Sequence, residues 1–321
     1  MKSVLVTHAD LPLGRRIAKV LWHDARVDRI VALGEGGMPR AFAGWRSGAA
    51  ARLVYERVDL ARQRAVSELF RSKRMRVLTI DSVVHVPPHG AAQDGPPLAG
   101  RVAPRTAEAR HLLHFASESR TIRRLVAIGS AFVYRLAPGN ANHLTEASPL
   151  DLEPDVDALR RAWIDCDMLF HAAAAGTRLQ VALLRVPTVV ASGGYVYLHP
   201  GLEGAAGVRL RPLGFDPLCP VIADKDVALA VRAALACDRT GVFNVAGRDA
   251  VPLSVLGRWT GRPCLPVPGA LLRGASAGPQ LRYGMSLDTR RAAEQLGFEP
   301  RYRVGVARAG DGALRLEAVA S

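Results

Sequence analysis

The chain begins with Met1-Lys-Ser-Val-Leu-Val-Thr-His-Ala-Asp-Leu-Pro-Leu-Gly14, and this stretch decides the fold. Its β-branched run, Ser3–Thr7, predicts a buried strand, and the apolar spacing that starts at Gly14 predicts a helix. A strand, a short turn and a helix in this order form the frame of a dinucleotide-binding turn, Gly-x-x-Gly-x-x-Gly. Here the three glycine positions hold His8, Leu11 and Gly14. The glycine that packs the helix on the strand is present, whereas the two that bring the backbone close to a pyrophosphate are replaced.

The replaced glycines predict a weakened cofactor site. A β-carbon at His8 and the large side chain of Leu11 should crowd the phosphates, so we expect no dinucleotide or only weak NAD(P) binding. The His8 ring would either cap the turn through a backbone hydrogen bond or contact an anionic ligand. After the second predicted strand, Gly34 is followed by Glu35, which is either a ligand for ribose hydroxyls or a solvated loop acid.

Length and composition indicate a globular α/β protein of 321 residues, 49 % of them hydrophobic. No apolar stretch reaches the ~20 residues that span a bilayer, and no signal peptide is visible, so we expect a cytoplasmic protein with no membrane segment. The cysteines, which are widely separated, form no Cys-x-x-Cys or Cys/His cluster, so the sequence predicts no metal site.

The net charge of +14 comes almost entirely from arginine. Its densest cluster, residues 71–76, joins a predicted helix to a predicted strand, where solvated charge is usual. No aromatic residues are interleaved with the basic ones, so an arginine-rich surface is favoured over a nucleic-acid site. We expect the partner to be an unknown small molecule or protein, and a homodimer is compatible with the sequence.

Strand-like and helix-like segments alternate through most of the chain, which predicts a doubly wound parallel sheet with helices on both faces, the Rossmann arrangement. The predicted strands are Ser3–Thr7, Arg29–Leu33, Leu53–Arg57, Val77–His85, Leu125–Ser130, Gln180–Val186 and Gly241–Val245. The predicted helices are Gly14–His23, Ala61–Lys73, Ala107–Ser119, Val156–Ala175, Asp226–Ala236 and Leu287–Leu296. The segments Pro87–Pro104 and Ala191–Pro220, rich in Pro and Gly, are predicted to be irregular.

The second irregular segment marks a predicted domain boundary. Residues 1–190 should form the dinucleotide-binding-type domain, and residues 191–321 a smaller carboxy-terminal domain of the substrate-binding type. Residues 218–247 should return to the first domain, since they contain a further helix and strand.

Short motifs spread over nearly the whole chain resemble those of the extended short-chain dehydrogenase/reductases, the NAD-dependent epimerase/dehydratase family. The motifs that carry the resemblance are Val4–Thr7, Val58-Asp59-Leu60, Val83–Val86, Ile128–Tyr134, Thr145–Leu150, Arg185–Val189, Ile222–Val227, Gly241–Val245 and Leu296-Gly297-Phe298-Glu299-Pro300. The resemblance implies the Rossmann fold with a smaller substrate domain. It also implies that Asp59 lies near an adenine and that Ser130 hydrogen-bonds a substrate oxygen.

The chain departs from this family at the catalytic pair, a tyrosine whose pKa is lowered by a lysine four residues later. Counted from the acidic motif, the tyrosine position falls on Leu159, the lysine position on Trp163 and the following acidic position on Asp167. No Tyr-x-x-x-Lys occurs anywhere, and the only lysines are Lys2, Lys19, Lys73 and Lys225. Neither an aliphatic nor an indole side chain exchanges a proton usefully near neutral pH, so the standard proton transfer is not expected.

Without its tyrosine partner, Ser130 is interpreted as a serine that bonds backbone at a strand end, with the substrate contact as the alternative. Tyr134 and His85 are interpreted as buried structural residues. Trp163 is predicted to be buried and to fill the space that a nicotinamide would take.

Three functions are compatible with these patterns. The first is a non-catalytic binding, scaffold or regulatory protein that keeps the cleft of the fold. The second is an NAD(P)-dependent epimerase, dehydratase or oxidoreductase that uses unusual residues on a nucleotide sugar or a small hydroxy or keto compound. The third is a basic protein that docks nucleic acid or an acidic partner. Function has to be argued from the site and not from the fold, and the site residues favour the first.

Overall fold

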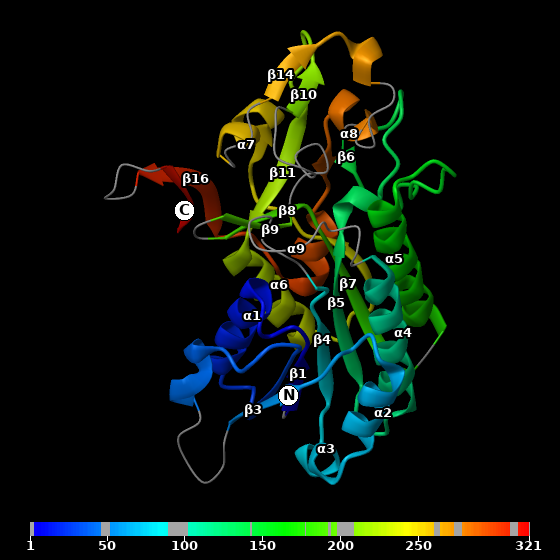
Figure 1. The fold of residues 1–321 in the computed structure, drawn as a ribbon, viewed down its shortest axis with the longest axis vertical. Helices are drawn as coiled ribbons and strands as arrows, with labels where there is room; N and C mark the ends of the chain where they lie inside the picture. Colours follow the sequence, from blue (N-terminus) through cyan, green and yellow to red (C-terminus); the bar gives the residue numbers. More distant parts are fainter. Residues whose placement is uncertain are drawn as a thin grey trace.

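A seven-stranded parallel sheet forms the centre of the protein, with strand order β12-β7-β5-β4-β1-β2-β3 (Figure 1). The structure, a computed structural model, describes residues 3–45, 52–88, 102–141, 143–176, 178–191, 194–197, 209–259, 264–272, 278–308 and 314–320. The strands of the sheet are β1 (Ser3–Val6), β2 (Arg29–Gly34), β3 (Leu53–Arg57), β4 (Ser82–His85), β5 (Arg124–Ser130), β7 (Gln180–Val186) and β12 (Gly241–Asn244). Because β1 connects to β2 on one side and pairs with β4 on the other, the sheet has its topological switch point at β1.

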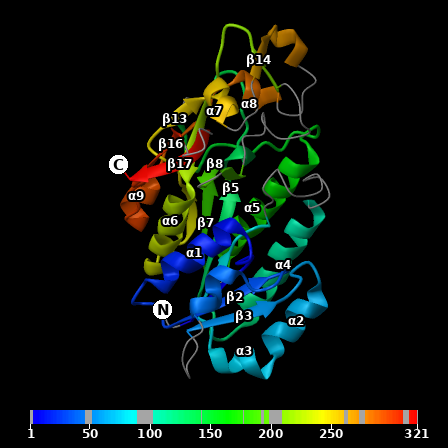
Figure 2. The ribbon, with the colours of Figure 1, turned by 60° about the vertical axis from the view of Figure 1, so that its left-hand side comes forward.

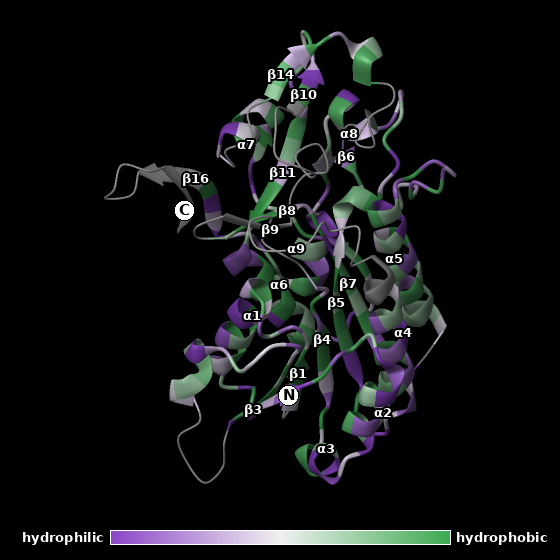
Figure 3. Cartoon of the chain, viewed as in Figure 1, coloured by the Kyte–Doolittle hydropathy of each residue, from purple (hydrophilic) through white to green (hydrophobic). Residues whose placement is uncertain are grey.

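Helices cover both faces of the sheet, which confirms the predicted doubly wound Rossmann fold. The helices are α1 (Pro12–Trp22), α2 (Gln63–Arg71), α3 (Lys73–Leu78), α4 (Val102–Glu118), α5 (Ala158–Gly176), α6 (Asp224–Ala236) and α9 (Arg290–Leu296). Helices α1, α6 and α9 pack on one face, and α2 to α5 pack on the other (Figure 2). Along β1, Val4 and Val6 enter one core and Leu5 the other, since successive side chains of a strand point to opposite faces. A strand buried on both faces is mostly apolar, as the largely green central strands of Figure 3 show.

A second region of small sheets lies beyond the carboxyl ends of the central strands (Figure 1). Its sheets have the strand orders β13-β11-β8-β9, β10-β14, β15-β6 and β16-β17. The strands are β6 (His143–Leu144), β8 (Thr188–Ala191), β9 (Gly194–Tyr197), β10 (Arg209–Pro212), β11 (Leu218–Ala223), β13 (Ala250–Pro252), β14 (Cys264–Val267), β15 (Ser286–Leu287), β16 (Tyr302–Arg308) and β17 (Leu314–Ala320). Short helices α7 (Leu253–Trp259) and α8 (Gly278–Arg282) accompany them.

The predicted irregularity of residues 191–220 was wrong for the part that the structure describes. Strand β9 and strand β10 lie within it, and β11 begins at its end. Strand β9 pairs with β8, which lies next to it in the sequence, whereas β10 and β11 pair with strands that are distant in the sequence. The pairing, and not the local sequence, makes each of them extended. The remaining residues of this segment lie outside the described residues.

Several element boundaries also differ from the prediction; for example, α9 begins at Arg290 and not at Leu287, which lies in strand β15. The predicted strand 77–85 begins only at Ser82, because Ser72 starts a new helix by accepting a hydrogen bond from the Met75 amide at 3.2 Å, and this helix, α3, ends at Leu78. Val77, which the apolar run had placed in a strand, is 78 % exposed on that helix. Helix α4 begins at Val102, five residues before the predicted start, and Pro104 therefore lies in its first turn, where proline is tolerated. The intervening residues 89–101 lie outside the described residues.

A buried ion pair joins α5 to β7. Both carboxylate oxygens of Asp167 accept hydrogen bonds of 2.8 Å from the guanidinium of Arg185, and the two side chains are 1 % and 2 % exposed. The same guanidinium lies over the ring of Tyr134, 4.7 Å from its centroid. The Tyr134 hydroxyl in turn donates to Asn244 Oδ1 at 2.6 Å.

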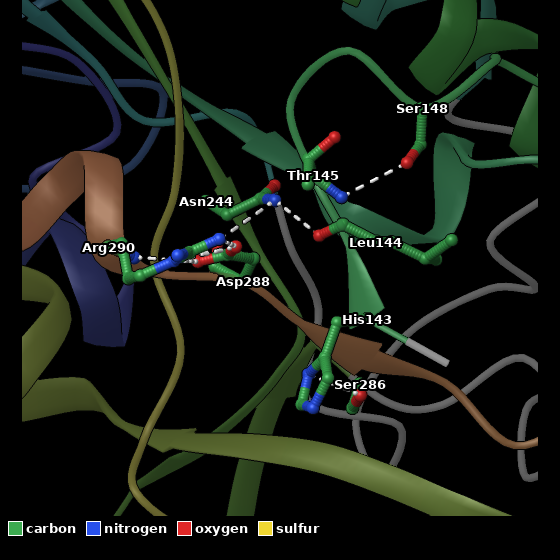
Figure 4. A network of polar contacts seen from close by, with 8 residues as sticks. All are labelled: His143, Leu144, Thr145, Ser148, Asn244, Ser286, Asp288 and Arg290. Carbon is green, nitrogen blue, oxygen red and sulfur yellow. Dashed lines mark hydrogen bonds and ion pairs between the residues drawn. The ribbon is translucent and has the colours of Figure 1, made fainter. Parts of the chain in front are cut away.

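Asn244 extends this network into the small sheets (Figure 4). Its side-chain amide donates to the carbonyl of Leu144 at 2.9 Å and to that of Asp288 at 3.3 Å. Its backbone N–H donates to Glu146 Oε1 at 2.8 Å. One asparagine therefore links β12 to β6 and to the segment that precedes α9.

We expect Asp167→Asn to destabilise the protein by about 3–5 kcal/mol, because it leaves the Arg185 charge buried without its counter-ion. The free energy of unfolding from urea titration measures the effect. Arg290→Gln, which breaks an ion pair whose guanidinium is 82 % exposed, is the control and should change the midpoint little. Equal effects of the two substitutions would contradict the structural role of the buried pair.

Candidate functional site

The turn between β1 and α1 carries one of the three glycines of a dinucleotide-binding turn, Gly14. His8 takes the first glycine position with a φ of 46°, in the left-handed region that favours glycine. A β-carbon at Gly14 would lie 2.1 Å from the His8 carbonyl oxygen, so only glycine fits there. Leu11 precedes α1 and its amide donates to the His8 carbonyl at 3.0 Å. The turn is therefore closed by its own backbone at the place where phosphate would be expected.

The His8 ring forms a contact that the sequence did not predict. Its Nε2 lies 3.0 Å from Glu108 Oε2, and the two side chains are 3 % and 1 % exposed. Glu108 comes from the middle of α4, on the other side of the switch point. Neither of the two expected roles, a backbone cap or a contact with an anionic ligand, describes this ring, which pairs with a carboxylate.

Further carboxylates surround this pair. A ligand atom of Glu35 lies within 4.8 Å of those of His8 and Glu108. Asp10, in the same turn as His8, accepts a hydrogen bond from the Gly36 amide at 2.8 Å through its Oδ2. Burial raises the pKa of Glu35, His8 opposes the shift, and the nearby Glu108, Asp59 and Asp10 carboxylates add to it. The phosphate end of the cleft is therefore acidic in a protein that is basic overall.

An open cavity of about 650 Å³ lies next to this acidic group. Glu35 and Asp59 both line it, so the structure brings together two residues that are 24 positions apart in sequence. Asp59 is already engaged, because its Oδ1 accepts from the Ala61 amide at 3.0 Å and its Oδ2 pairs with Arg62 at 3.0 Å. This cavity lies beyond the carboxyl ends of β2 and β3, on the side where the adenosine half of a dinucleotide lies in Rossmann folds.

The positions that the resemblance assigns to the catalytic tyrosine and lysine lie in an apolar cluster. Trp163 and Ile164 pack with Val133, which lies in the turn just after β5, and the partly buried Leu159 packs against them. Trp163 is 9 % exposed, which confirms its predicted burial. Asp167, one helical turn after Trp163, forms the ion pair with Arg185. Positions 159, 163 and 167 share one face of α5, so the ion pair directs positions 159 and 163 towards this cluster.

The other catalytic candidates are engaged in structural contacts. Ser130 Oγ accepts a hydrogen bond from the Phe132 amide at 3.2 Å and caps the short turn that follows β5. Burial raises the pKa of Tyr134, whose hydroxyl is bonded to Asn244. His85, 2 % exposed, lies 3.3 Å from the Thr7 hydroxyl through its Nδ1. These contacts agree with the structural interpretation of all three residues.

Glu108 and Asp10 are the site residues that sequence reasoning missed. Glu108 is separated from His8 by 100 positions, and no spacing rule connects them. One signal was present: Glu108, Leu112 and Phe115 share one helix face at i, i+4 and i+7, and the last two are buried. A carboxylate on an apolar helix face needs a partner inside the protein.

Comparisons with known proteins agree with the fold. No protein-family profile matches the chain. Uncharacterized proteins of Mycobacterium tuberculosis and Mycobacterium bovis are 26 % identical over 331 residues, which covers 94 % of this chain and 81 % of theirs. Within the described residues, no helix is long and apolar enough to cross a membrane.

Solved structures of sugar-modifying enzymes align over most of the chain. The dTDP-glucose 4,6-dehydratase of Bacillus anthracis, in complex with NAD, is 14 % identical with a TM-score of 0.66, over 94 % of this chain and 92 % of its own. The UDP-glucose 4-epimerase of Thermotoga maritima, with UDP-glucose, is 13 % identical with a TM-score of 0.67, over 94 % of both chains. The chain therefore has the fold of the NAD-dependent sugar epimerases and dehydratases, as its motifs predicted.

Removing the Trp163 side chain should leave a large cavity. We expect Trp163→Ala to lower the free energy of unfolding by about 3 kcal/mol or more. Met168→Ala on the same helix, where the side chain is 49 % exposed, is the control and should have a small effect. If both substitutions had the same small effect in urea titrations, the packing role of Trp163 would be refuted.

His85 should make the protein sensitive to acid. Burial, with a smaller contribution from His8, lowers the pKa of His85 from 6.5 to about 3. The unfolded chain therefore binds a proton that the folded state rejects, and stability should fall as the pH decreases from 6.5 towards 3. Urea midpoints measured across this range should decrease less for His85→Gln than for the wild type. His171→Gln, an exposed histidine on α5, is the control, and a wild-type slope in both variants would count against this expectation.

Proposed function

We propose that this protein binds a ligand in the cleft of an epimerase-type fold without carrying out the standard tyrosine-dependent hydride transfer. The observation that carries the proposal is the buried His8–Glu108 pair in the turn that would hold the pyrophosphate of a dinucleotide. This pair acts as a barrier in two ways, one steric and one electrostatic.

The steric part comes from the His8 side chain, which occupies a glycine position and is buried against Glu108. The electrostatic part comes from the carboxylates of Glu108, Glu35 and Asp10, which gather at the turn. Two like charges 4 Å apart repel by about 4 kcal/mol at the effective dielectric of a protein surface. A diphosphate bound at the turn would therefore be repelled by these carboxylates.

The apolar cluster around Trp163 supports the same proposal from the other end of the cleft. It contains no group that takes or gives a proton where the fold's enzymes place their tyrosine and lysine. The ligand is expected to be a small molecule or a segment of a protein partner that is neutral or positively charged in the region of Glu35 and Glu108.

The open cavity between Glu35 and Asp59 favours a second candidate, an NAD(P)-dependent epimerase or dehydratase with unusual catalytic residues. Solved structures of the same fold contain NAD. Ser130 would then be the donor to a substrate oxygen, since its hydroxyl accepts a backbone hydrogen bond and keeps its own hydrogen for donation. Weak binding of the adenosine half would be compatible with both candidates.

Isothermal titration with NAD⁺, NADH, NADP⁺ and NADPH distinguishes them. We expect no dissociation constant in the low micromolar range for the wild type. The triple variant His8→Gly, Leu11→Gly, Glu108→Ala should gain affinity, because it restores the glycines and removes the acid that would be left unpaired. Leu11→Gly alone keeps the ion pair and is the control that should stay without binding. Low micromolar binding by the wild type would refute the first candidate and favour the second.

A further inference from the structure

We infer that His8, Glu35 and Glu108 form a binding site for one divalent transition-metal ion of the Zn²⁺ or Mn²⁺ class. The inference goes beyond the proposed function, and either can fail while the other stands. The sequence predicted no metal site, because the three residues lie far apart and match no metal motif.

The geometry of the three side chains fits a small cation. Their ligand atoms all lie within 4.8 Å of one another, and His8 Nε2 is already 3.0 Å from Glu108 Oε2. Ligands bound at about 2.0–2.2 Å in tetrahedral geometry lie roughly 3.4 Å apart. Glu35 therefore has to approach by about 1 Å, which its long, exposed side chain permits by changing rotamer.

The fold holds two of these ligands firmly. His8 lies in the closed turn after β1, and Glu108 lies in the middle of a helix that packs on the sheet. Glu35 directly follows β2, the neighbour of β1. A site on one helix and on the ends of two adjacent strands needs little ordering when the ion binds.

An unsatisfied carboxylate oxygen is the independent observation that favours a ligand here. Glu108 Oε1 is buried and has no hydrogen-bond partner among the described residues, although the side chain is only 1 % exposed. Among the ion pairs described, the only partner of Glu108 is His8. A buried carboxylate with a free oxygen is costly, and a bound cation would satisfy it. Asp10 Oδ1, in the same turn, is also buried without a partner.

The ligand set indicates which class of ion would bind. One imidazole with two carboxylates suits Zn²⁺, Mn²⁺ and Fe²⁺, whereas Ca²⁺ and Mg²⁺ prefer oxygen ligands alone. Three protein ligands leave at least one coordination position for water or for a ligand. That position would face the cavity of about 650 Å³ that Glu35 lines.

Titration of the chelator-treated full chain with Co²⁺ and then Zn²⁺ tests the inference. We expect one equivalent to bind with micromolar or tighter affinity, and the Co²⁺ spectrum to lack the intense near-ultraviolet band of thiolate ligands. Glu108→Gln and His8→Gly should each weaken binding by at least about tenfold, equivalent to roughly 1.4 kcal/mol. Glu108→Gln keeps the shape of the side chain, and in His8→Gly the relief of the left-handed backbone offsets part of the cost of the unpaired Glu108.

Two matched controls should bind like the wild type. Glu68→Gln changes an acid that lines the same cavity but belongs to an exposed pair with Arg64. His114→Gln changes an exposed histidine on α4. Circular dichroism and thermal melts confirm that every variant is folded, and Zn²⁺ should raise the melting temperature of the wild type and the controls only.

Three outcomes would overturn the inference: no binding of either metal below millimolar concentration, a thiolate spectrum, or binding that neither site variant weakens. If neither a metal nor a dinucleotide binds, the inference fails and the proposed function stands. If a metal binds and NAD also binds with low micromolar affinity, the metal site stands and the proposed function fails.

Discussion

The buried pair between Asp167 and Arg185 is the constraint on which the geometry of the cleft depends. A bidentate ion pair without solvent fixes the rotation of α5 about its axis and its position along β7. Leu159, Trp163 and Asp167 follow one another at intervals of four residues and therefore share one face of α5. The rotation of the helix thus decides where the side chains of Leu159 and Trp163 lie.

Packing and backbone conformation also constrain the turn at the phosphate end of the cleft. The turn after β1 keeps the left-handed conformation of a glycine at His8 and the close packing at Gly14. A helix N-terminus favours an anion, but the carboxylates of Glu108, Glu35 and Asp10 lie close together at this turn. A chain with a net charge of +14 therefore presents a local negative field where phosphate would bind. Overall charge gives no indication of the charge of this site.

The sequence predicted the architecture well because the signals are long and repeated. Seven apolar strands alternate with helices in one order, and small boundary errors do not change that order. It failed where pairing with a distant strand decides the structure, as for β10, and where one side chain redirects the chain, as Ser72 does. Of the residues in the candidate site, His8, Glu35 and Trp163 were singled out from the sequence, whereas Glu108 was missed because only the fold brings α4 to β1.

The residues at the two ends of the cleft depend on their neighbours through packing. A lysine at position 163 would enter a pocket of Val133, Ile164 and Leu159 with no counter-ion in that cluster, which costs far more than the loss of the indole alone. A glycine at position 8 would leave Glu108 buried without its only described partner in an ion pair. A single substitution at either position therefore destabilises the protein unless neighbouring residues change with it.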